Sequence, residues 1–344
     1  MSVPIPTNAW YPVCRSKQLR KSPLKRQLLG QDLVLFRDAN RSPVALQDRC
    51  PHRNVPLSEG WVTAGEIVCP YHGWRFNVRG ECTEIPGRCI QKMRQSFAAV
   101  RFAVVEQQDL IWVYASPDVI PETRPYLLPE YATPGFSSLV WETELNTTLP
   151  RLAENFLDGT HTHYVHNGLI RKQSKKRQAV QVKVVCTSNQ VEAQYLNDPS
   201  LSGMIRKLLA PGSKSIDAFG RFLVPGIAQL EYRSDKQFQL YISACMSPIT
   251  QDRQRVFAVM TFRWGPPNFL ARCLATPLFR LALKQDKHIV EIQSENIQRY
   301  QEERFAYTEL DLLAPHIQRL LKSHARGTPP DPDYYQERHI EMMI

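Results

Sequence analysis

Two short Cys/His pairs near the start of the chain have the composition of a metal centre. Cys50-Pro51-His52 is followed, after sixteen intervening residues, by Cys69-Pro70-Tyr71-His72. Thiolates and imidazoles bind zinc, and they also bind the two irons of some iron–sulfur clusters. We expect each pair to lie on a loop that follows a strand, so that two loops hold one centre from two sides.

The order of these ligands favours an iron–sulfur cluster. A zinc finger groups its Cys residues in one pair and its His residues in another. Here each loop supplies one Cys and one His, which lets both thiolates bind one iron and both imidazoles bind the other. Zinc stays open as the alternative, and the content of iron and sulfide would distinguish the two.

A second group of metal donors begins at Asp158. Asp158 and His161 are three residues apart and would share one face of a helix. His161 and His166 are five apart, which separates them by about 140° on a continuous helix. Both reach one metal if the helix loosens before His166, and Asn167-Gly168 suits a helix end there. Two His and one carboxylate form the facial triad of non-haem Fe(II) oxygenases, which leaves open positions on the metal.

The carboxylate of such a triad must come from elsewhere in the chain. We select Asp286, because it lies in segment 277–305, which we expect to be a long helix. Glu291 and Glu295 offer the same chemistry. His163 is two residues from His161 and would point elsewhere on a helix, so we do not expect it to bind the metal.

The first pair of motifs lies in a region with the pattern of a small all-β domain, which we assign to residues 1–116. Glycines separate short apolar segments there, and the expected strands are Asp32–Arg37, Val44–Asp48, Glu66–Tyr71, Ala98–Glu106 and Leu110–Ala115. Five prolines between residues 117 and 134 predict a stiff linker, which we assign to 117–137.

The second group of donors lies in a region, 138–326, that combines helices with many consecutive strands. This combination predicts an α+β fold in which an antiparallel sheet is flanked by helices. The expected helices are Arg151–Tyr164, Pro277–Phe305 and Glu309–Ser323, and the expected strands are Val180–Thr187, Gln190–Leu196, Phe219–Val224, Gln229–Arg233, Gln237–Ser247 and Arg255–Trp264. We expect Leu201–Ser215 to form a lid and the tail, 327–344, to be irregular.

Composition places the chain among water-soluble globular proteins. Its 344 residues show no stretch of 18 apolar residues and no secretory signal pattern, so we expect a cytoplasmic protein with reduced cysteines. The formal net charge is +10, and the cations gather in Arg15–Arg26 and Arg171–Arg177. Such surfaces attract nucleic acid, membranes or acidic proteins, or they are simply solvated.

The two motif groups resemble those of the Rieske non-haem iron oxygenases. The resemblance rests on CPHRNVPLSEG (50–60), on CPYHGWRFN (69–77) and on the pattern Asp-x2-His-x4-His with a later Asp. It implies a [2Fe–2S] cluster on Cys50, His52, Cys69 and His72, and a mononuclear Fe(II) on His161, His166 and Asp286. It also implies a Rieske domain followed by a catalytic domain of the helix-grip type.

The same resemblance implies roles and partners. Asp158 would link His72 of one subunit to His161 of the next, in a homotrimer, and Asn155 would be a polar residue near the iron. Electrons from NAD(P)H would arrive through a flavin reductase, with or without an acidic ferredoxin, and the basic segments would dock that partner. O2 would be the co-substrate.

The expected function is that of a terminal oxygenase component that hydroxylates or oxidatively demethylates a bulky, apolar or aromatic substrate. Aromatic residues expected near a pocket are Phe219, Phe222, Tyr232, Phe238, Tyr241, Phe257 and Phe262. The alternative is a Rieske-type electron-transfer protein without oxygenase chemistry, although it would need only the first domain. A basic zinc protein that binds nucleic acid is a third interpretation, and metal content separates it from the others. The choice between mono- and dioxygenation stays open.

Overall fold

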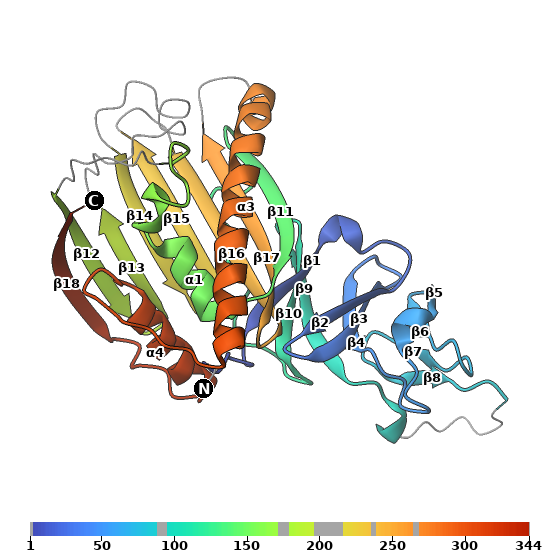
Figure 1. Cartoon of the computed structure of the whole chain (residues 1–344). Coiled ribbons are helices and arrows are strands. Elements are labelled where there is room, and N and C mark those ends of the chain that lie inside the picture. The colour runs from blue at the N-terminus through green and yellow to red at the C-terminus, as the bar shows by residue number, and fades with distance from the viewer. Residues whose placement is uncertain are drawn as a thin grey trace. The chain divides into compact units, whose positions relative to one another are not determined.

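The computed structural model describes residues 3–87, 95–170, 179–195, 216–234, 239–263 and 268–343 (Figure 1). The predicted basic segment Arg171–Arg177 and the predicted lid Leu201–Ser215 lie outside these ranges. The chain divides into two compact units. The N-terminal unit contains Thr7–Leu127 and Ser247–Thr250, and the C-terminal unit contains the remaining residues. The main part of the N-terminal unit ends at Leu127, inside the proline-rich segment.

The N-terminal unit is built from two antiparallel sheets. The larger one has the strand order β1-β10-β9-β4-β3-β2, formed by Trp10–Arg15 (β1), Leu24–Leu28 (β2), Gln31–Arg37 (β3), Pro43–Gln47 (β4), Arg101–Gln107 (β9) and Leu110–Pro117 (β10). The smaller one is Trp61–Thr63 (β5), Glu66–Val68 (β6), Arg75–Phe76 (β7) and Cys82–Glu84 (β8). The prediction of a small all-β domain is confirmed.

An apolar core joins the strands of this unit to both Cys/His loops. Phe36, Leu46 and Phe76 are fully buried and belong to one cluster with Cys50 and Cys69. The cysteines are therefore fixed by the core of the domain, and the loops that carry them are not free surface loops.

The C-terminal unit is one eight-stranded sheet in the order β11-β17-β16-β15-β14-β13-β12-β18. Its strands are Ser137–Leu145 (β11), Ala179–Thr187 (β12), Gln190–Tyr195 (β13), Ile216–Leu223 (β14), Ile227–Ser234 (β15), Gln239–Thr250 (β16), Arg253–Arg263 (β17) and Tyr335–Met343 (β18). The helices are Leu149–Leu157 (α1), Asn268–Tyr300 (α3) and Ala314–Ala325 (α4), and in Figure 1 α1 and α3 lie across one face of the sheet. The α+β prediction is confirmed.

The predicted helix over Arg151–Tyr164 is wrong in its second half. Helix α1 ends at Leu157, and Asp158 is its extended C-cap residue. The Asp158 carboxylate accepts hydrogen bonds from the backbone N–H groups of Thr160 and His161, at 2.7 and 3.1 Å. An aspartate that bonds the following backbone in this way competes with helix continuation. Asp158 and His161 therefore do not share a face of one helix.

The ends of the later elements also differ from expectation. Helix α3 spans Asn268–Tyr300 and contains Pro277. It therefore begins and ends earlier than the predicted helix, Pro277–Phe305. The tail is not irregular throughout, because β18 pairs antiparallel with β12 along its whole length, from Thr187↔Tyr335 to Ala179↔Met343. The prediction of an irregular tail was wrong because β18 is stabilised by β12, which lies about 150 residues earlier in the sequence. A local sequence pattern does not reveal such a distant partner. None of the helices in the described ranges is both long and apolar enough to span a membrane.

Candidate metal centres and substrate pocket

The two Cys/His loops of the N-terminal unit have the same backbone hydrogen bonds. In the first loop the Cys50 N–H donates to Val55 O (2.9 Å) and the Asn54 N–H donates to Cys50 O (2.9 Å). In the second loop the Cys69 N–H donates to Trp74 O (2.8 Å) and the Gly73 N–H donates to Cys69 O (3.1 Å).

Each loop reverses at a residue with positive φ, Asn54 (61°) in one and Gly73 (70°) in the other. Asn and Gly are the residues that adopt this conformation most readily. The chain therefore builds the same short loop twice, and each copy carries one Cys at its start and one His inside it.

The side chains of the two loops separate by type. Cys50 and Cys69 are buried free cysteines. Burial, together with the hydrogen bond to Cys69, raises the pKa of the Cys50 thiol to about 11. The rings of His52 and His72 lie 4.6 Å apart, and His52 stacks on Trp74 at 4.7 Å. Thiols thus adjoin thiols on the core side, and imidazole adjoins imidazole at the surface.

This separation fits a two-iron cluster better than one zinc ion. A single tetrahedral ion would draw all four donor atoms to one point. Within the described ranges, the three donors that converge in this way belong to His161, His166 and Asp286, and the Cys/His loops do not form such a group. A paired arrangement of two thiols and two imidazoles is what a Rieske [2Fe–2S] cluster requires.

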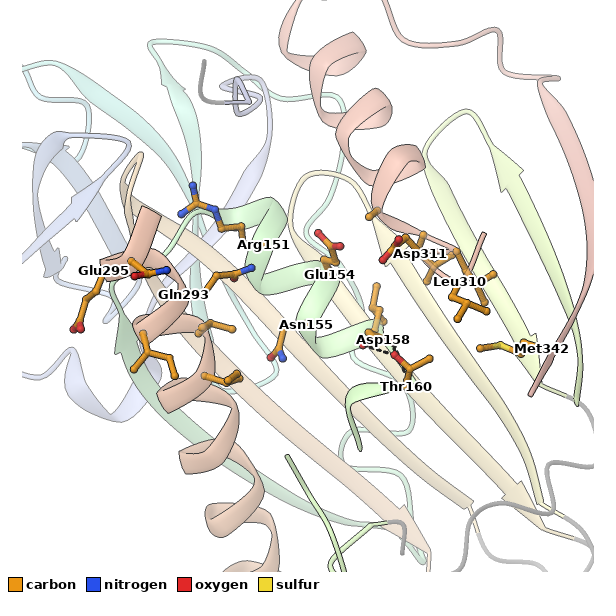
Figure 2. Close-up of a pocket in the computed structure, with 18 of the residues that line it drawn as sticks. Arg151, Glu154, Asn155, Asp158, Thr160, Gln293, Glu295, Leu310, Asp311 and Met342 are labelled. Atoms are coloured by element: carbon orange, nitrogen blue, oxygen red, sulfur yellow. Dashed lines mark hydrogen bonds between the residues drawn. The ribbon is translucent and has the colours of Figure 1, made fainter. Parts of the chain in front are cut away.

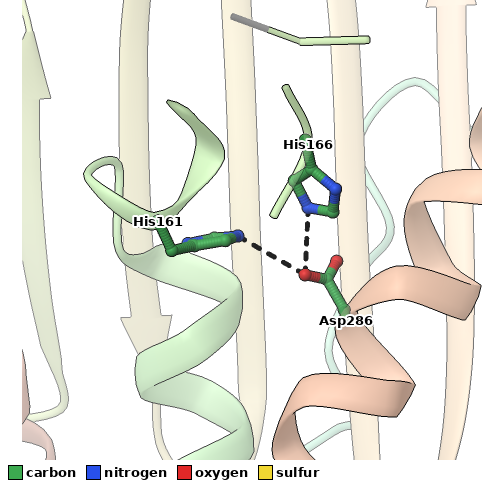
Figure 3. Close-up of side chains that lie close together, drawn as sticks. All are labelled: His161, His166 and Asp286. Carbon is green, nitrogen blue, oxygen red and sulfur yellow. Dashed lines mark ion pairs between the residues drawn. The ribbon is translucent and has the colours of Figure 1, made fainter. Parts of the chain in front are cut away.

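The second group of predicted donors converges in the C-terminal unit. His161 lies in a short 3-10 turn (161–163) after α1, His166 follows it, and Asp286 projects from α3 (Figure 3). One ligand atom from each residue lies within 4.8 Å of the others. Asp286 Oδ1 is 2.9 Å from His166 Nε2 and 3.4 Å from His161 Nε2. Because this turn replaces the helix, the side chains of His161 and His166 can both face Asp286 although they are five residues apart.

The electrostatics of this group match a cation site. Burial lowers the pKa of His161, but the Asp158 and Asp286 carboxylates outweigh that effect and raise the pKa to about 9. Both ring nitrogens of His161 and Oδ1 of Asp286 are buried without a hydrogen-bond partner. Buried polar atoms without a partner are costly unless a ligand satisfies them. The remaining ring nitrogen of His166, Nδ1, lies 2.9 Å from Gln285 Oε1, which orients the ring.

The rival donors lie elsewhere. Glu291 accepts from the Asn146 N–H at 3.1 Å and faces Lys287 at 3.7 Å. Glu295 is exposed and lines a different cavity. His163 is not part of the converging group. Of the three carboxylates considered, Asp286 alone meets both histidines among the described residues.

Two cavities lie on either side of Asp158. An apolar pocket contains the converging group and is lined mainly by aliphatic and aromatic residues, among them Leu230, Tyr232, Leu240, Ile242, Met260, Phe279 and Leu283. A polar cavity of about 750 Å³ lies between α1, α3 and the segment before α4, and it is lined among others by Arg151, Glu154, Asn155, Asp158, Glu295, Arg299 and Asp311 (Figure 2). Leu157, Asp158 and Tyr195 line both.

The predicted accessory residues Asp158 and Asn155 differ in position, because Asp158 lines both cavities and Asn155 lines only the polar one. Asp158 Oδ2 lies 3.6 Å from His161 Nδ1, so it adjoins the histidine on the side away from Asp286. Asn155 lines the polar cavity, and its Oδ1 is buried without a hydrogen-bond partner. Sequence reasoning missed Gln285, Thr160 and Tyr195. Of these three, only Gln285 could have been found from the sequence, because it directly precedes the predicted ligand Asp286.

The aromatic residues expected near the pocket divide between pocket and core. Phe219 and Tyr232 line the apolar pocket, whereas Phe222, Phe257 and Phe262 are core residues exposed by 2% or less. Tyr241 packs on Phe136 instead, and Phe238 lies outside the described residues.

Family models match both units. Residues 9–94 match the Rieske [2Fe-2S] domain, and residues 145–327 match the vanillate O-demethylase oxygenase C-terminal domain, which is more than half of the chain. The chain belongs to the Rieske non-haem iron oxygenases. Members of this family carry a [2Fe–2S] cluster and a mononuclear iron, and the donor sets described above fit both groups.

Several relatives of this Rieske oxygenase are known in bacteria. The chain is 31% identical over 220 residues to the oxygenase component of dicamba O-demethylase from Stenotrophomonas maltophilia, covering 62% of each chain. It is 40% identical over 122 residues to 4beta-methylsterol monooxygenase from Methylococcus capsulatus, covering 34% of this chain and 33% of the relative. Other relatives are chloroplast proteins, such as chlorophyllide a oxygenase from Chlamydomonas reinhardtii, and across these relatives the aligned part spans 24% to 62% of the relative's length.

Solved structures share the whole fold. Dicamba monooxygenase bound to 3,6-dichlorosalicylic acid superposes with a TM-score of 0.80 at 24% identity, covering 93% of this chain and 97% of that one. At this identity the likeness concerns the fold.

Proposed function

We propose that this chain is the terminal oxygenase component of a multicomponent system, which uses O2 and two electrons to hydroxylate or oxidatively demethylate an organic substrate. The convergence of His161, His166 and Asp286 at the edge of an apolar pocket carries this proposal. An electron carrier needs no such pocket, so this observation favours the oxygenase over the electron-transfer alternative. The relatives named as demethylases and monooxygenases support the same reading.

The ligand assignment follows from the two donor sets. Cys50 and Cys69 would hold one iron of the cluster, and His52 and His72 would hold the other. His161, His166 and Asp286 would hold the mononuclear iron, which supplies the activation of O2 when it is bound. The chain's own contribution is to orient these ligands, through Gln285 and Asp158, and to exclude water with the apolar walls.

The lining of the pocket indicates the substrate class. Leu240, Ile242 and Met260 present aliphatic carbon, and Tyr232 and Phe279 present rings. Such walls gain free energy by covering apolar surface, about 25 cal/mol per Å². We therefore assign an apolar or aromatic substrate whose reacting carbon faces the triad. Relatives named as O-demethylases of dicamba and of vanillate, and one named as a 4beta-methylsterol monooxygenase, are consistent with this class.

Electrons would reach the triad through Asp158. In this proposal three chains form a ring, and His72 of a second copy approaches Asp158 from the polar cavity. His72 is exposed and Asp158 already contacts His161 at 3.6 Å, so a hydrogen-bonded path between the two metal centres needs only that docking step. We retain the division into a Rieske domain (1–116), a linker (117–137) and a catalytic domain (138–326) for these roles.

The electron donor would be an acidic ferredoxin or a flavin reductase supplied with NAD(P)H. The described basic segment Arg15–Arg26 supports this assignment, since Lys17, Arg20, Lys21 and Lys25 are exposed on it. Charge pairing of this kind raises the association rate and weakens with salt. We place the system in the cytoplasm.

Metal analysis and a turnover assay test the proposal together. Anaerobically purified protein is expected to hold three irons and two acid-labile sulfides per chain, because the cluster takes two of each and the triad takes one iron. Dithionite-reduced protein is then exposed to O2 with 2-methoxynaphthalene, a neutral aryl methyl ether, and 2-naphthol is measured. Two irons with two sulfides, unchanged on adding Fe(II), would show that the triad does not bind iron and would favour the electron carrier.

A further inference from the structure

The reaction needs protons as well as electrons, and the carboxyls that line the apolar pocket already face the proposed metal ligands. Hydroxylation balances as R–H + O2 + 2 e⁻ + 2 H⁺ → R–OH + H2O. The ionisable carboxyls that line the pocket are Asp158 and Asp286. Asp158 lies 3.6 Å from His161, and Asp286 lies 2.9 Å from His166, so both carboxyls are engaged at the proposed iron site.

The polar cavity on the other side of Asp158 holds a further carboxyl, that of Glu154, which does not line the apolar pocket. Glu154 lies one helical turn before Asp158 on α1, and Figure 2 shows its carboxyl beside that of Asp311. Burial, with the negative charges of Asp311, Asp158 and Glu303, raises the pKa of Glu154 to about 7. Glu154 therefore exchanges a proton near neutral pH.

The two arginines that line the cavity with Glu154 are Arg151 and Arg299. Arg151 is paired with Glu303 at 2.8 Å. Arg299 and Glu295 line the cavity from α3, and Tyr307, in the segment between α3 and α4, senses the charge of Glu154. The groups that dominate the surroundings of Glu154 are thus acidic, which favours its protonated form.

We propose that Glu154 is the group through which protons enter the reaction, passing from the polar cavity across the wall that it shares with the apolar pocket. This rests on the proposed oxygenase function. The shared wall is Leu157, Asp158 and Tyr195, so a proton released by Glu154 has one layer of side chains to cross. Solvent would reprotonate Glu154 from the cavity, and water would carry the proton past Asp158. Electrons and protons then arrive at the same end of the site.

The test compares Glu154→Gln with the wild type in two measurements. Difference infrared spectra of metal-free protein are expected to show a protonated carboxyl that disappears as pH rises through about 7 and that is missing from the variant. Reduced, iron-loaded protein is then mixed with O2 and 2-methoxynaphthalene, and reoxidation of the cluster is followed by its visible absorption. We expect the variant to be slowed about tenfold, in keeping with the loss of one proton donor, and to lose the fall in rate above pH 7.

Two further variants separate this role from a structural one. Asp311→Asn removes the largest charge acting on Glu154, so the pH at which the rate falls should move downward. Glu302→Gln, an exposed glutamate that does not line the cavity, is the matched control and should resemble the wild type. Wild-type behaviour of Glu154→Gln, or the absence of a carboxyl titrating near 7, would overturn the proposal. Failure of the wild type to bind the third iron would instead contradict the proposed function. The infrared measurement uses metal-free protein, so its result does not depend on iron binding.

Discussion

Asp286 Oδ1 lies between two histidines, 2.9 Å from His166 Nε2 and 3.4 Å from His161 Nε2. One oxygen atom thus faces both imidazoles, although α3 and the turn at residues 161–163 are more than 100 residues apart in sequence. Three donors at one point, with Oδ1 lacking a hydrogen-bond partner, form a site that is ready for an ion before the ion arrives.

Removing this carboxylate should remove the mononuclear iron and spare the cluster. Asp286→Ala is expected to bind two irons and two sulfides per chain where the wild type binds three and two. The visible spectrum of the cluster should be unchanged, because its ligands lie in the other unit. Glu291→Ala, on the same helix but outside the converging group, is the control and should retain three irons.

Iron binding should depend on pH through His161. Its pKa of about 9 means that iron must displace a proton at neutral pH. Calorimetry of Fe(II) binding to protein lacking the mononuclear iron, at pH 7 in buffers of different ionisation enthalpy, should report the release of about one proton. Proton release near zero would contradict the assignment of His161 as a ligand.

The same raised pKa has a consequence for stability without iron. A histidine whose folded pKa exceeds its unfolded value near 6.5 stabilises the fold below that value, and the stabilisation is lost as pH rises through 9. The effect is on the order of 3 kcal/mol. Urea unfolding of protein lacking the mononuclear iron at pH 6.5 and pH 9.5 should show this loss, and His161→Gln should reduce it. A pH-independent midpoint would show that the carboxylates do not hold the proton on His161.

Asp158 should matter for electron transfer more than for metal content. Asp158→Asn removes the charge next to His161 but keeps a hydrogen-bonding side chain for Thr160. We expect three irons per chain to be retained and reoxidation of the cluster by O2 to slow by about tenfold to hundredfold, the usual effect of changing an outer partner of a metal ligand. Loss of iron in proportion to the loss of rate would indicate that Asp158 only positions the ligand.

The first cluster loop depends on Asp48. Its buried carboxylate accepts from the Ser58 N–H at 2.7 Å and from Ser58 Oγ at 2.6 Å. Asp48→Ala would leave the Ser58 N–H without its partner, at a cost of about 1–3 kcal/mol, and the cluster should be lost faster on warming, as followed by its visible absorption. Lys25→Ala removes the exposed ion-pair partner of Asp48, 3.9 Å away, and should change the rate of loss little.

The candidate donors of both proposed metal centres stand out in the sequence because their chemistry leaves few alternatives, and the structure brings His161, His166 and Asp286 together. Cys50, His52, Cys69 and His72 stand in short motifs, and the long helix that carries Asp286 is visible in the pattern of the sequence. The break after α1 could not be predicted in the same way. It depends on the Asp158 carboxylate bonding the backbone of Thr160 and His161, a local competition that a helical pattern does not record.

Features that depend on distant segments were out of reach of the sequence. The polar cavity forms only where α1 meets α3 and the segment before α4, so the charges that raise the pKa of Glu154 come from positions such as Glu303 and Asp311. The strand character of Tyr335–Met343 depends on its pairing with β12. Neither relation is local, and a single sequence offers no measure of which distant residues meet.

The pairing of β18 with β12 also bears on how the protein can be handled. Strand β12 alternates buried valines with polar residues, and β18 covers the backbone edge that β12 would otherwise present. A chain cut back before Tyr335 would expose a regular, half-apolar strand edge, the kind of surface on which chains aggregate.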